Sequence, residues 1–424
     1  MNTTKTFKKD QSLKIAICLV GDFPEGTGAS SRMLAFAKSL KRLNHQPEIF
    51  LLRPTVFNDN LCNTQVKGEH EGIPFEYLTQ ATDEGKGFFQ KSKRYFRSQW
   101  NFLRQVLMPK SKFDFYYFYT PALLPFFFFH LYLKLRNKNV VFEFTEHFST
   151  LSRGKFNFLF LKTRLKEVAS PYFTHHLFCI STPIYRFYRY YLPASRVHLF
   201  PILVEKSRFK TVRLLQAYPL PYRWKISSTG VKPKKWSLSV LPQTFTLGYV
   251  GSFGAKDGVA AMVRAFQQAK LEIPHLKLRL MGHSENGKWI AELKQVNGIQ
   301  LIFQPTAKEI PHLLQGCDCL IVNRTNDAFA HHGFPTKLGE YLATGRPVIA
   351  TKVGDLLLYL KHGKEVYAIP PEDEAALTQA MLKRYNDKTK FDGMGERGRI
   401  RAMSCFEADQ NTQRVLRLLS GSKR

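Results

Sequence analysis

The sequence has few cysteines and few acidic residues for its length. Six cysteines are spread over 424 residues, and their spacing matches neither a metal-binding motif nor a small disulfide framework. Reduced thiols, as in cytosolic proteins, are therefore expected. Lysine and arginine total 63 against 33 acidic residues, a net charge of +30. Such a charge favours phosphorylated ligands, an anionic membrane surface or nucleic acid. Because no zinc-finger, RNA-recognition or helix-turn-helix signature is present, we rank a membrane above nucleic acid.

A long uninterrupted apolar segment is also missing. The most apolar stretch, 116–133, contains Pro121, Pro125 and His130, whereas a membrane-spanning helix needs about 20 mainly apolar residues. Residues 1–14 are polar and basic without an apolar centre, so no secretory signal is expected. These features predict a cytoplasmic protein without a membrane-spanning helix.

Short apolar runs alternate with amphipathic stretches along most of the chain, which is long enough for two domains. The apolar runs predict buried strands at 14–20, 47–52, 113–119, 139–145 and 177–180, and again at 245–250, 276–281, 299–303, 319–322 and 348–350. Helical periodicity lies between several of them. This alternation predicts an α/β fold with parallel sheets.

The stretch 331–350 carries the strongest indication of a ligand. Gly333 is expected to let the backbone turn tightly, and Pro335 suits the first turn of a helix. A helix is predicted from about Thr336 to Ala343, with a strand at 348–350. Its N-terminus would offer free N–H groups and the positive end of the helix dipole, with Lys337 beside them. That combination suits an anion such as a diphosphate.

One turn further along this helix, the carboxylate of Glu340 could accept hydrogen bonds from vicinal hydroxyl groups such as a ribose diol. The alternative interpretation is an ordinary loop, helix and strand with Glu340 on a solvated face.

The same stretch resembles the nucleotide-sugar site of family 4 retaining glycosyltransferases. Their usual pattern is Glu-Gly-Phe-Gly-x-Pro-x-x-Glu, a small-residue turn and Pro-Val-Ile. A sub-group from bacterial surface-polysaccharide clusters has Gly-Phe-Pro-Thr-Lys-Leu-x-Glu-Tyr-Leu-Ala-Thr-Gly. The resemblance implies that the donor is bound by His332, Gly333, Phe334, Pro335, Thr336, Lys337 and Glu340. His332 stands in the place of the first family glutamate.

This resemblance implies the GT-B fold, in which two Rossmann-like domains face each other across a cleft and a C-terminal helix crosses back to the first domain. We therefore expect an acceptor domain over 1–204 and a basic linker over 205–243. A nucleotide-sugar domain over 244–395 and a crossover helix over 396–424 would follow.

In the resembling family, the loop after the first strand of each domain approaches the ligands. Gly28 lies in the first such loop, which lacks the Gly-x-Gly-x-x-Gly fingerprint; a plain loop is the alternative. In the second loop, Ser252 stands at the place of the family arginine, and Lys256 precedes the place of the family lysine by one residue. Arg324, after the strand at 319–322, is expected to supply the missing charge.

Glu146 and His147 follow the strand at 139–145. Side chains just beyond the carboxyl ends of parallel strands line the ligand crevice of open α/β sheets, and relatives often carry a cleft-lining acid or histidine there. We expect Glu146 and His147, together with Lys256 and Arg324, to be catalytic. A surface pair at 146–147 is the alternative.

The segment 88–112 combines cations with aromatic residues, and Phe96, Trp100, Leu103 and Leu107 recur at helical spacing. Two interpretations stay open: a helix lying in a membrane interface, or a surface helix whose apolar stripe docks on the domain core. The basic linker likewise either lies on an anionic lipid or acceptor or is simply solvated.

The sequence thus predicts a retaining glycosyltransferase that moves a sugar from a nucleotide-diphosphate donor to a hydroxyl of a glycan or lipid-linked acceptor. Cationic side chains would replace a divalent ion, so neither a metal nor another cofactor is expected. The alternatives are a related nucleotide-sugar epimerase or hydrolase, and a non-catalytic basic scaffold that binds membrane or nucleic acid. The cytoplasm, at the inner face of the plasma membrane, is the expected location.

Overall fold

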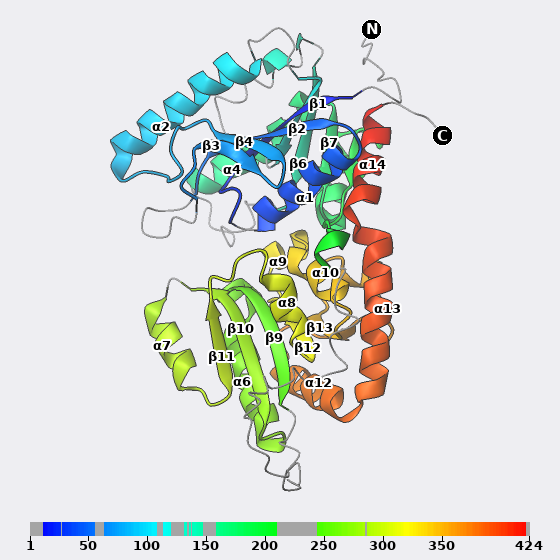
Figure 1. Cartoon of the computed structure of the whole chain (residues 1–424). Coiled ribbons are helices and arrows are strands. Elements are labelled where there is room, and N and C mark those ends of the chain that lie inside the picture. Colours follow the sequence, from blue (N-terminus) through cyan, green and yellow to red (C-terminus); the bar gives the residue numbers. More distant parts are fainter. Residues whose placement is uncertain are drawn as a thin grey trace, which may run out of the picture.

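The computed structural model of the chain describes residues 12–26, 28–55, 63–107, 113–119, 131–133, 135–136, 138–146, 158–209, 244–284 and 286–420. Two α/β domains lie one above the other in Figure 1, each built around its own sheet. The predicted α/β fold with two Rossmann-like domains is therefore confirmed.

The first sheet has the strand order β3-β4-β2-β1-β5-β6-β7-β8. Its parallel strands are β1 (Lys14–Val20), β2 (Gln46–Arg53), β4 (Ile73–Tyr77), β5 (Phe115–Tyr119), β6 (Asn139–Phe144), β7 (His176–Cys179) and β8 (Val197–Leu199). The edge strand β3 (Lys67–His70) pairs with β4 in antiparallel fashion. This hairpin was not predicted, because β3 (Lys-Gly-Glu-His) has no apolar side chain and β4 (Ile-Pro-Phe-Glu-Tyr) contains no long apolar run.

Helices cover both faces of the first sheet (Figure 1). They are α1 (Gly28–Arg42), α2 (Gly87–Asn101) with its π-helical extension η2 (Phe102–Leu107), α4 (Phe158–Ala169), η4 (Ser170–Phe173), α5 (Thr182–Tyr191) and η5 (Lys206–Phe209). The side chains of β5 alternate between two cores: Tyr116 and Phe118 lie in one, Tyr117 and Tyr119 in the other. A strand buried on both faces reads as a continuous apolar run, which is why it could be predicted.

The second sheet is parallel throughout, in the order β11-β10-β9-β12-β13-β14. Its strands are β9 (Phe245–Ser252), β10 (Leu276–His283), β11 (Ile299–Phe303), β12 (Cys319–Val322), β13 (Val348–Thr351) and β14 (Tyr367–Ile369). Its helices are η6 (Ala255–Asp257), α6 (Val259–Glu272), α7 (Gly287–Gln295), α8 (Ile310–Gln315), α9 (Ala328–His332), α10 (Thr336–Ala343), α11 (Leu356–Tyr359) and α12 (Glu374–Asn386).

Two further helices, α13 (Lys388–Phe406) and α14 (Ala408–Leu419), run along one side of both domains (Figure 1). At Gly395 the backbone of α13 comes so close to the second domain that an added Cβ would lie 2.2 Å from the Gly345 carbonyl oxygen. On α14, Asp409 accepts a 2.9 Å hydrogen bond from Arg42 Nε of α1. The expected boundary at 395/396 therefore falls inside α13, and it is α14 that packs on the first domain.

A buried ion pair ties three segments of the first domain together. The guanidinium of Arg32 on α1 donates to Glu143 Oε1 on β6 at 2.6 Å and to the carbonyl oxygens of Phe200 and Pro201 at 3.1 and 2.6 Å. Tyr117 of β5 donates to the second oxygen of Glu143. This network fixes the end of β6, and Glu146 follows Glu143 by three residues.

The helix predicted within 88–112 is present, but its aromatic half does not dock on the core. Phe96 and Trp100 are exposed, whereas Phe102, Val106 and Leu107 are buried. The interpretation of one continuous docked stripe is therefore wrong, because α2 turns Ser98 and Gln99 toward the core and leaves Phe96 and Trp100 on its exposed side. Among the helices of the described residues, none is long and apolar enough to cross a membrane.

Several predictions concern residues outside the described ranges. They are His147, most of the linker 205–243 and most of the apolar stretch 116–133.

Candidate functional site

The stretch 331–350 forms α9, a short loop, α10 and β13. The helix predicted at 336–343 is confirmed, with Pro335 as its N-cap residue and Gly345 in a left-handed conformation (φ 76°) after it. Gly333 has φ −83° and ψ 171°, an extended conformation open to any residue, so the tight turn expected there is wrong. An added Cβ would be in ordinary contact with its surroundings, 3.4 Å from the Phe329 carbonyl oxygen and 3.5 Å from Arg324 Nη1.

Phe334, between α9 and α10, anchors this loop to the core. Its ring is buried, with its centroid 5.4 Å from that of Tyr359 and 5.9 Å from that of Phe406. Phe334 therefore positions the loop through packing.

Lys337, on the first turn of α10, is held by two groups of the second domain. Its Nζ donates to Asp257 Oδ1 at 2.9 Å and to the Tyr249 hydroxyl at 3.1 Å, and it lies over the Tyr249 ring. Burial lowers the pKa of Lys337, as do the nearby charges of Arg324 and Lys256, while Asp257 acts in the opposite direction. Lys337 thus faces the interior of the site.

Asp257, on η6, is surrounded by three cations. Burial alone would raise the pKa of its carboxyl, but Lys337, Lys256 and Arg324 together lower it. Ser252 also lies close, with its Oγ 3.5 Å from Asp257 Oδ2. The three cations predicted to hold a diphosphate are therefore gathered around one carboxylate.

Arg324 follows β12 and is buried. Its backbone N–H donates to Thr351 Oγ1 at 2.9 Å. Within the described part of the chain, its Nε is buried without a hydrogen-bond partner. Because an unsatisfied buried donor is costly, this nitrogen is suited to an anionic acceptor. Lys256 is exposed, with its ammonium 5.6 Å from the centroid of the Phe329 ring.

Glu146 reaches the same cations from the first domain. Burial raises the pKa of its carboxyl, while the charges of Lys256 and Arg324 act to lower it. Residues almost 180 positions apart are thus brought together where the carboxyl ends of β6, β9 and β12 face each other. The carboxyl end of a parallel strand is the usual position for ligand-binding groups.

A cleft of about 660 Å³ is lined by both domains and reaches the start of α10 at Thr336, the residue before Lys337. Its walls include Gly28, Ser31, Arg208, Pro305, Lys308 and Glu340. A Cβ on Gly28 would lie 2.7 Å from Thr336 Oγ1, so the start of α1 lies directly against the first residue of α10. Gly28 therefore marks a contact between the domains.

Glu340 is engaged by a residue that the sequence analysis did not single out. Arg208 of η5 forms an ion pair with the Glu340 carboxylate, and its Nη2 donates to the Ala307 carbonyl oxygen at 2.8 Å. Arg208 lies in the segment predicted as a linker. That segment contains nine cations without a recognisable period, so the sequence does not indicate which of them enters the cleft.

His332 lies at the end of α9, where both its side chain and its carbonyl group make hydrogen bonds. Its Nδ1 lies 2.6 Å from the Ala328 carbonyl oxygen, and its own carbonyl accepts a hydrogen bond from Ser181 of the first domain. Next to Ser181, the backbone N–H of Thr182 donates to Asp355 Oδ2 at 2.6 Å. These bonds join α5 to the loops around α9 and α11.

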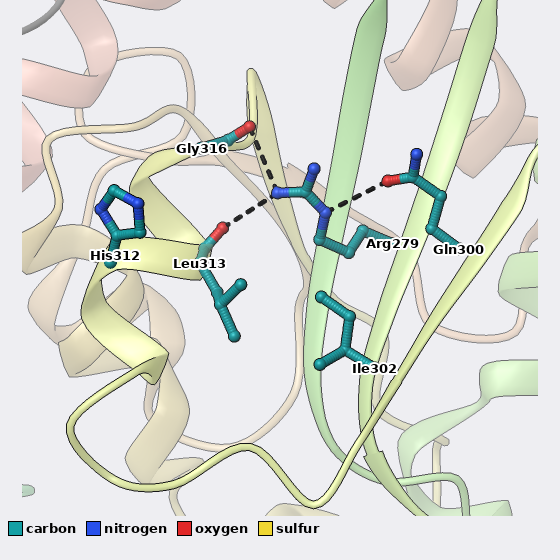
Figure 2. A pocket seen from close by; sticks show the side chains of 6 residues that line it. All are labelled: Arg279, Gln300, Ile302, His312, Leu313 and Gly316. Carbon is teal, nitrogen blue, oxygen red and sulfur yellow. Dashed lines mark hydrogen bonds between the residues drawn. The ribbon is translucent and has the colours of Figure 1, made fainter.

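A second hollow, of about 510 Å³, lies between α8 and the strands β10 and β11 (Figure 2). Arg279 points into it and donates to Gln300 Oε1 at 3.2 Å and to the carbonyl oxygens of Leu313 and Gly316 at 3.4 and 3.5 Å. None of the residues predicted to bind the donor lines this hollow. The inter-domain cleft is therefore the candidate site.

Residues 244–387 match the family model described as glycosyl transferases group 1. A stretch of 67 residues is 43% identical to a trehalose phosphorylase of Grifola frondosa, and one of 64 residues is 36% identical to that of Pleurotus pulmonarius. These stretches cover 16% and 15% of this chain and 9% of each relative. The match thus spans less than a tenth of the length of these curated relatives.

Solved structures resemble the whole chain. HepE of Anabaena in complex with UDP and glucose gives a TM-score of 0.68 at 17% identity, over 97% of this chain and 100% of that one. Sucrose-phosphate synthase of Thermosynechococcus elongatus gives a TM-score of 0.69 at 15% identity, over 96% of this chain and 98% of that one. WaaG is described as a glycosyltransferase involved in lipopolysaccharide biosynthesis. It gives a TM-score of 0.66 at 14% identity, over 96% of this chain and 100% of that one. These likenesses confirm the GT-B fold.

Replacing Asp257 by Asn tests the central position of this carboxylate. The variant leaves Lys337 buried without its counter-charge, so the free energy of unfolding should fall by about 3 kcal/mol at pH 7. Urea denaturation measures it. Because the pKa of Asp257 is lowered in the folded state, its contribution is present above the unfolded pKa of about 3.9. The difference from wild type should shrink as the pH falls below that value.

Glu374→Gln is the matched control, since Glu374 forms an exposed ion pair with Arg264 in the same domain. It should lower the free energy of unfolding by less than about 1 kcal/mol. Equal losses in the two variants would remove Asp257 from its central role.

Proposed function

We propose that this chain is a glycosyltransferase that moves a sugar from a nucleotide-diphosphate donor to a hydroxyl group of an acceptor. The match of 244–387 to glycosyl transferases group 1 supports it. So does the likeness to HepE, whose structures contain UDP, glucose or UDP-glucose. The observation that carries the proposal is the cation cluster around Asp257, which contains Arg324 Nε, buried and without a hydrogen-bond partner among the described residues.

The charges of this cluster fit a leaving diphosphate. Three cations face the carboxylates of Asp257 and Glu146, so an excess of positive charge is left for a bound anion. As the bond to the sugar breaks, negative charge grows on the diphosphate. Donors that bind this charge more tightly in the transition state lower the barrier.

The proposed roles follow the positions of the side chains. Lys256 and Arg324 contact the diphosphate, helped by the N–H groups after Gly333 at the start of α10. Lys337 is hydrogen-bonded to Asp257 and Tyr249, so it acts on the diphosphate through its positive charge and not through direct contact. The donor nucleoside lies toward the 660 Å³ cleft, with its ribose at Glu340.

We further propose that transfer is retaining and metal-independent, with the cationic side chains acting in place of a divalent ion. Glu146 faces the reacting sugar as its carboxylate partner. The acceptor is a hydroxyl of a glycan, and a lipid-linked glycan would suit the surface described in the next subsection.

The first test concerns the leaving group. Lys256→Ala and Arg324→Ala should each lower turnover by about 100-fold while changing nucleotide affinity less, because the charge that they stabilise develops in the transition state. Sugar transfer is measured by mass spectrometry with a panel of UDP-, GDP- and ADP-sugars. Arg264→Ala is the control, an exposed cation of the same domain.

A change in the Michaelis constant alone would contradict the assignment of Lys256 and Arg324. Release of free sugar without a transfer product for any acceptor would indicate a hydrolase. If the wild-type chain binds no nucleotide, the protein would be a non-catalytic scaffold.

The second test concerns the ribose. Glu340→Ala should weaken nucleotide binding by roughly 1–3 kcal/mol in calorimetry, the usual cost of losing a charge-assisted hydrogen bond. Arg208→Ala is the matched variant, because it breaks the same ion pair and keeps the carboxylate. If Arg208→Ala weakens binding as much as Glu340→Ala, the effect comes from the lost ion pair, and Glu340 does not contact the ribose.

The third test separates the two roles of Glu146. Glu146→Gln should lower turnover and tighten nucleotide binding, because the amide no longer competes for the charge of Lys256 and Arg324. In wild type the same tightening should appear as the pH falls through the raised pKa of Glu146, since protonation removes the negative charge. The pH dependence should be weaker in the variant, and unchanged turnover would remove Glu146 from the reaction.

A further inference from the structure

The outer face of α2 and η2 is both aromatic and basic. Six side chains share this face, at Phe89 and at four, seven, eight, eleven and fifteen residues after it. They are Phe89, Lys93, Phe96, Arg97, Trp100 and Arg104. Phe89, Phe96 and Trp100 are 87%, 68% and 63% exposed, and all three cations are exposed as well. Neither α2 nor η2 contains an acidic residue.

The inner side of the same helix has a different charge balance. Arg94 forms an ion pair with Asp83, and Lys91 Nζ lies 3.0 Å from Glu84 Oε2. Both acids belong to the segment just before α2. The acidic residues near the helix are therefore used on its inner side, and the positive charge of the outer face remains available to an anionic surface.

A second helix on the same side of the first domain also exposes apolar side chains. On α4, Leu161 and Leu165 are 53% and 61% exposed and lie one turn apart. Arg164, near them in sequence, lies over the Phe187 ring of α5, with the guanidinium 4.5 Å from the ring centroid. This contact places α4 against α5.

Core contacts show that α2 and α5 cover one face of the sheet. Phe102, just after α2, contacts Phe118 of β5, which contacts Phe142 of β6. Tyr188 of α5 contacts Phe144, two residues further along β6 and hence on the same face. The opposite face is covered by α1, with α14 beyond it, and α2 lies far from α14 in Figure 1.

We propose that this side of the first domain docks on an anionic membrane surface through the outer face of α2, with Leu161 and Leu165 adding apolar contact. The aromatic rings enter the interface, and Lys93, Arg97 and Arg104 lie against lipid phosphates. No helix of the described residues is both long and apolar enough to span a bilayer, so the proposed contact is interfacial. This inference does not depend on the proposed sugar transfer.

The mixture of side chains favours lipid over nucleic acid. Cations alone could bind either an anionic membrane or nucleic acid. Exposed leucine side chains, however, gain nothing from contact with the charged phosphate backbone of a nucleic acid. A bilayer takes up both kinds of side chain at once, because its headgroups are charged and its interface accepts aromatic and aliphatic groups.

The test is co-sedimentation of the full chain with vesicles of phosphatidylcholine alone or mixed with phosphatidylglycerol, across a salt series. Binding should need the anionic lipid and weaken with salt, and a fraction should persist at high salt because of the aromatic contact. The triple variant Lys93→Gln, Arg97→Gln, Arg104→Gln should lose the salt-dependent part. The triple variant Phe89→Ser, Phe96→Ser, Trp100→Ser should lose the salt-resistant part. All six side chains are exposed, so both variants should keep the fold.

The control removes three exposed lysines of the second domain, Lys383, Lys388 and Lys390, by substitution with Gln. Its binding should remain near that of wild type. A fluorescence blue shift on adding anionic vesicles, lost in Trp100→Phe, should report entry of this ring into the interface. Recovery in the supernatant under all conditions would overturn the proposal. So would an equal loss in the control, or retention on duplex RNA that tracks the same substitutions without any binding to vesicles.

Discussion

The arrangement of the site depends on the carboxylate of Asp257. It lies within the field of three cations, and Lys337 is bonded to it directly. Without such a carboxylate, like charges this close would repel one another. The buried ammonium of Lys337 would then either lose its proton or move toward solvent. Asp257 therefore allows the second domain to hold a positive cluster before any ligand arrives. A cluster fixed in advance loses little energy to reorganisation when charge develops beside it.

The first domain supplies a comparable anchor. Arg32 and Glu143 form a buried ion pair, and the carbonyl oxygens of Phe200 and Pro201 each accept a hydrogen bond from the guanidinium. Burial raises the pKa of Glu143, and the Arg32 charge works against that rise. Because β6 and the segment leaving the domain are both bonded to Arg32, the position of Glu146 relative to the second domain is set by this network.

Much of the fold could be predicted from the sequence, since both sheets consist mainly of strands buried on two faces. The strand Lys14–Val20 and the helix Thr336–Ala343 agree with their predicted bounds, because apolar runs, Pro335 and Gly345 mark them clearly. The edge hairpin β3–β4 was missed, because half of its residues are polar. The gathering of Lys256, Arg324 and Glu146 followed from one rule, that the carboxyl ends of parallel strands meet at a crevice. Arg208 and the exposure of Phe96 could not be predicted, because each depends on which neighbour the folded chain places beside it.

The two described crossings between the domains lie against each other. The N–H of Val204 donates to the Phe406 carbonyl oxygen at 2.7 Å, and the N–H of Ala408 donates to the Val204 carbonyl oxygen at 3.0 Å. Two connections pinned together act mechanically as one hinge, so the domains can rotate about this point more easily than they can slide. Displacement in a rotation grows with distance from its axis. Contacts beside Val204 would therefore change little on opening, whereas groups that face each other farther from it would separate first.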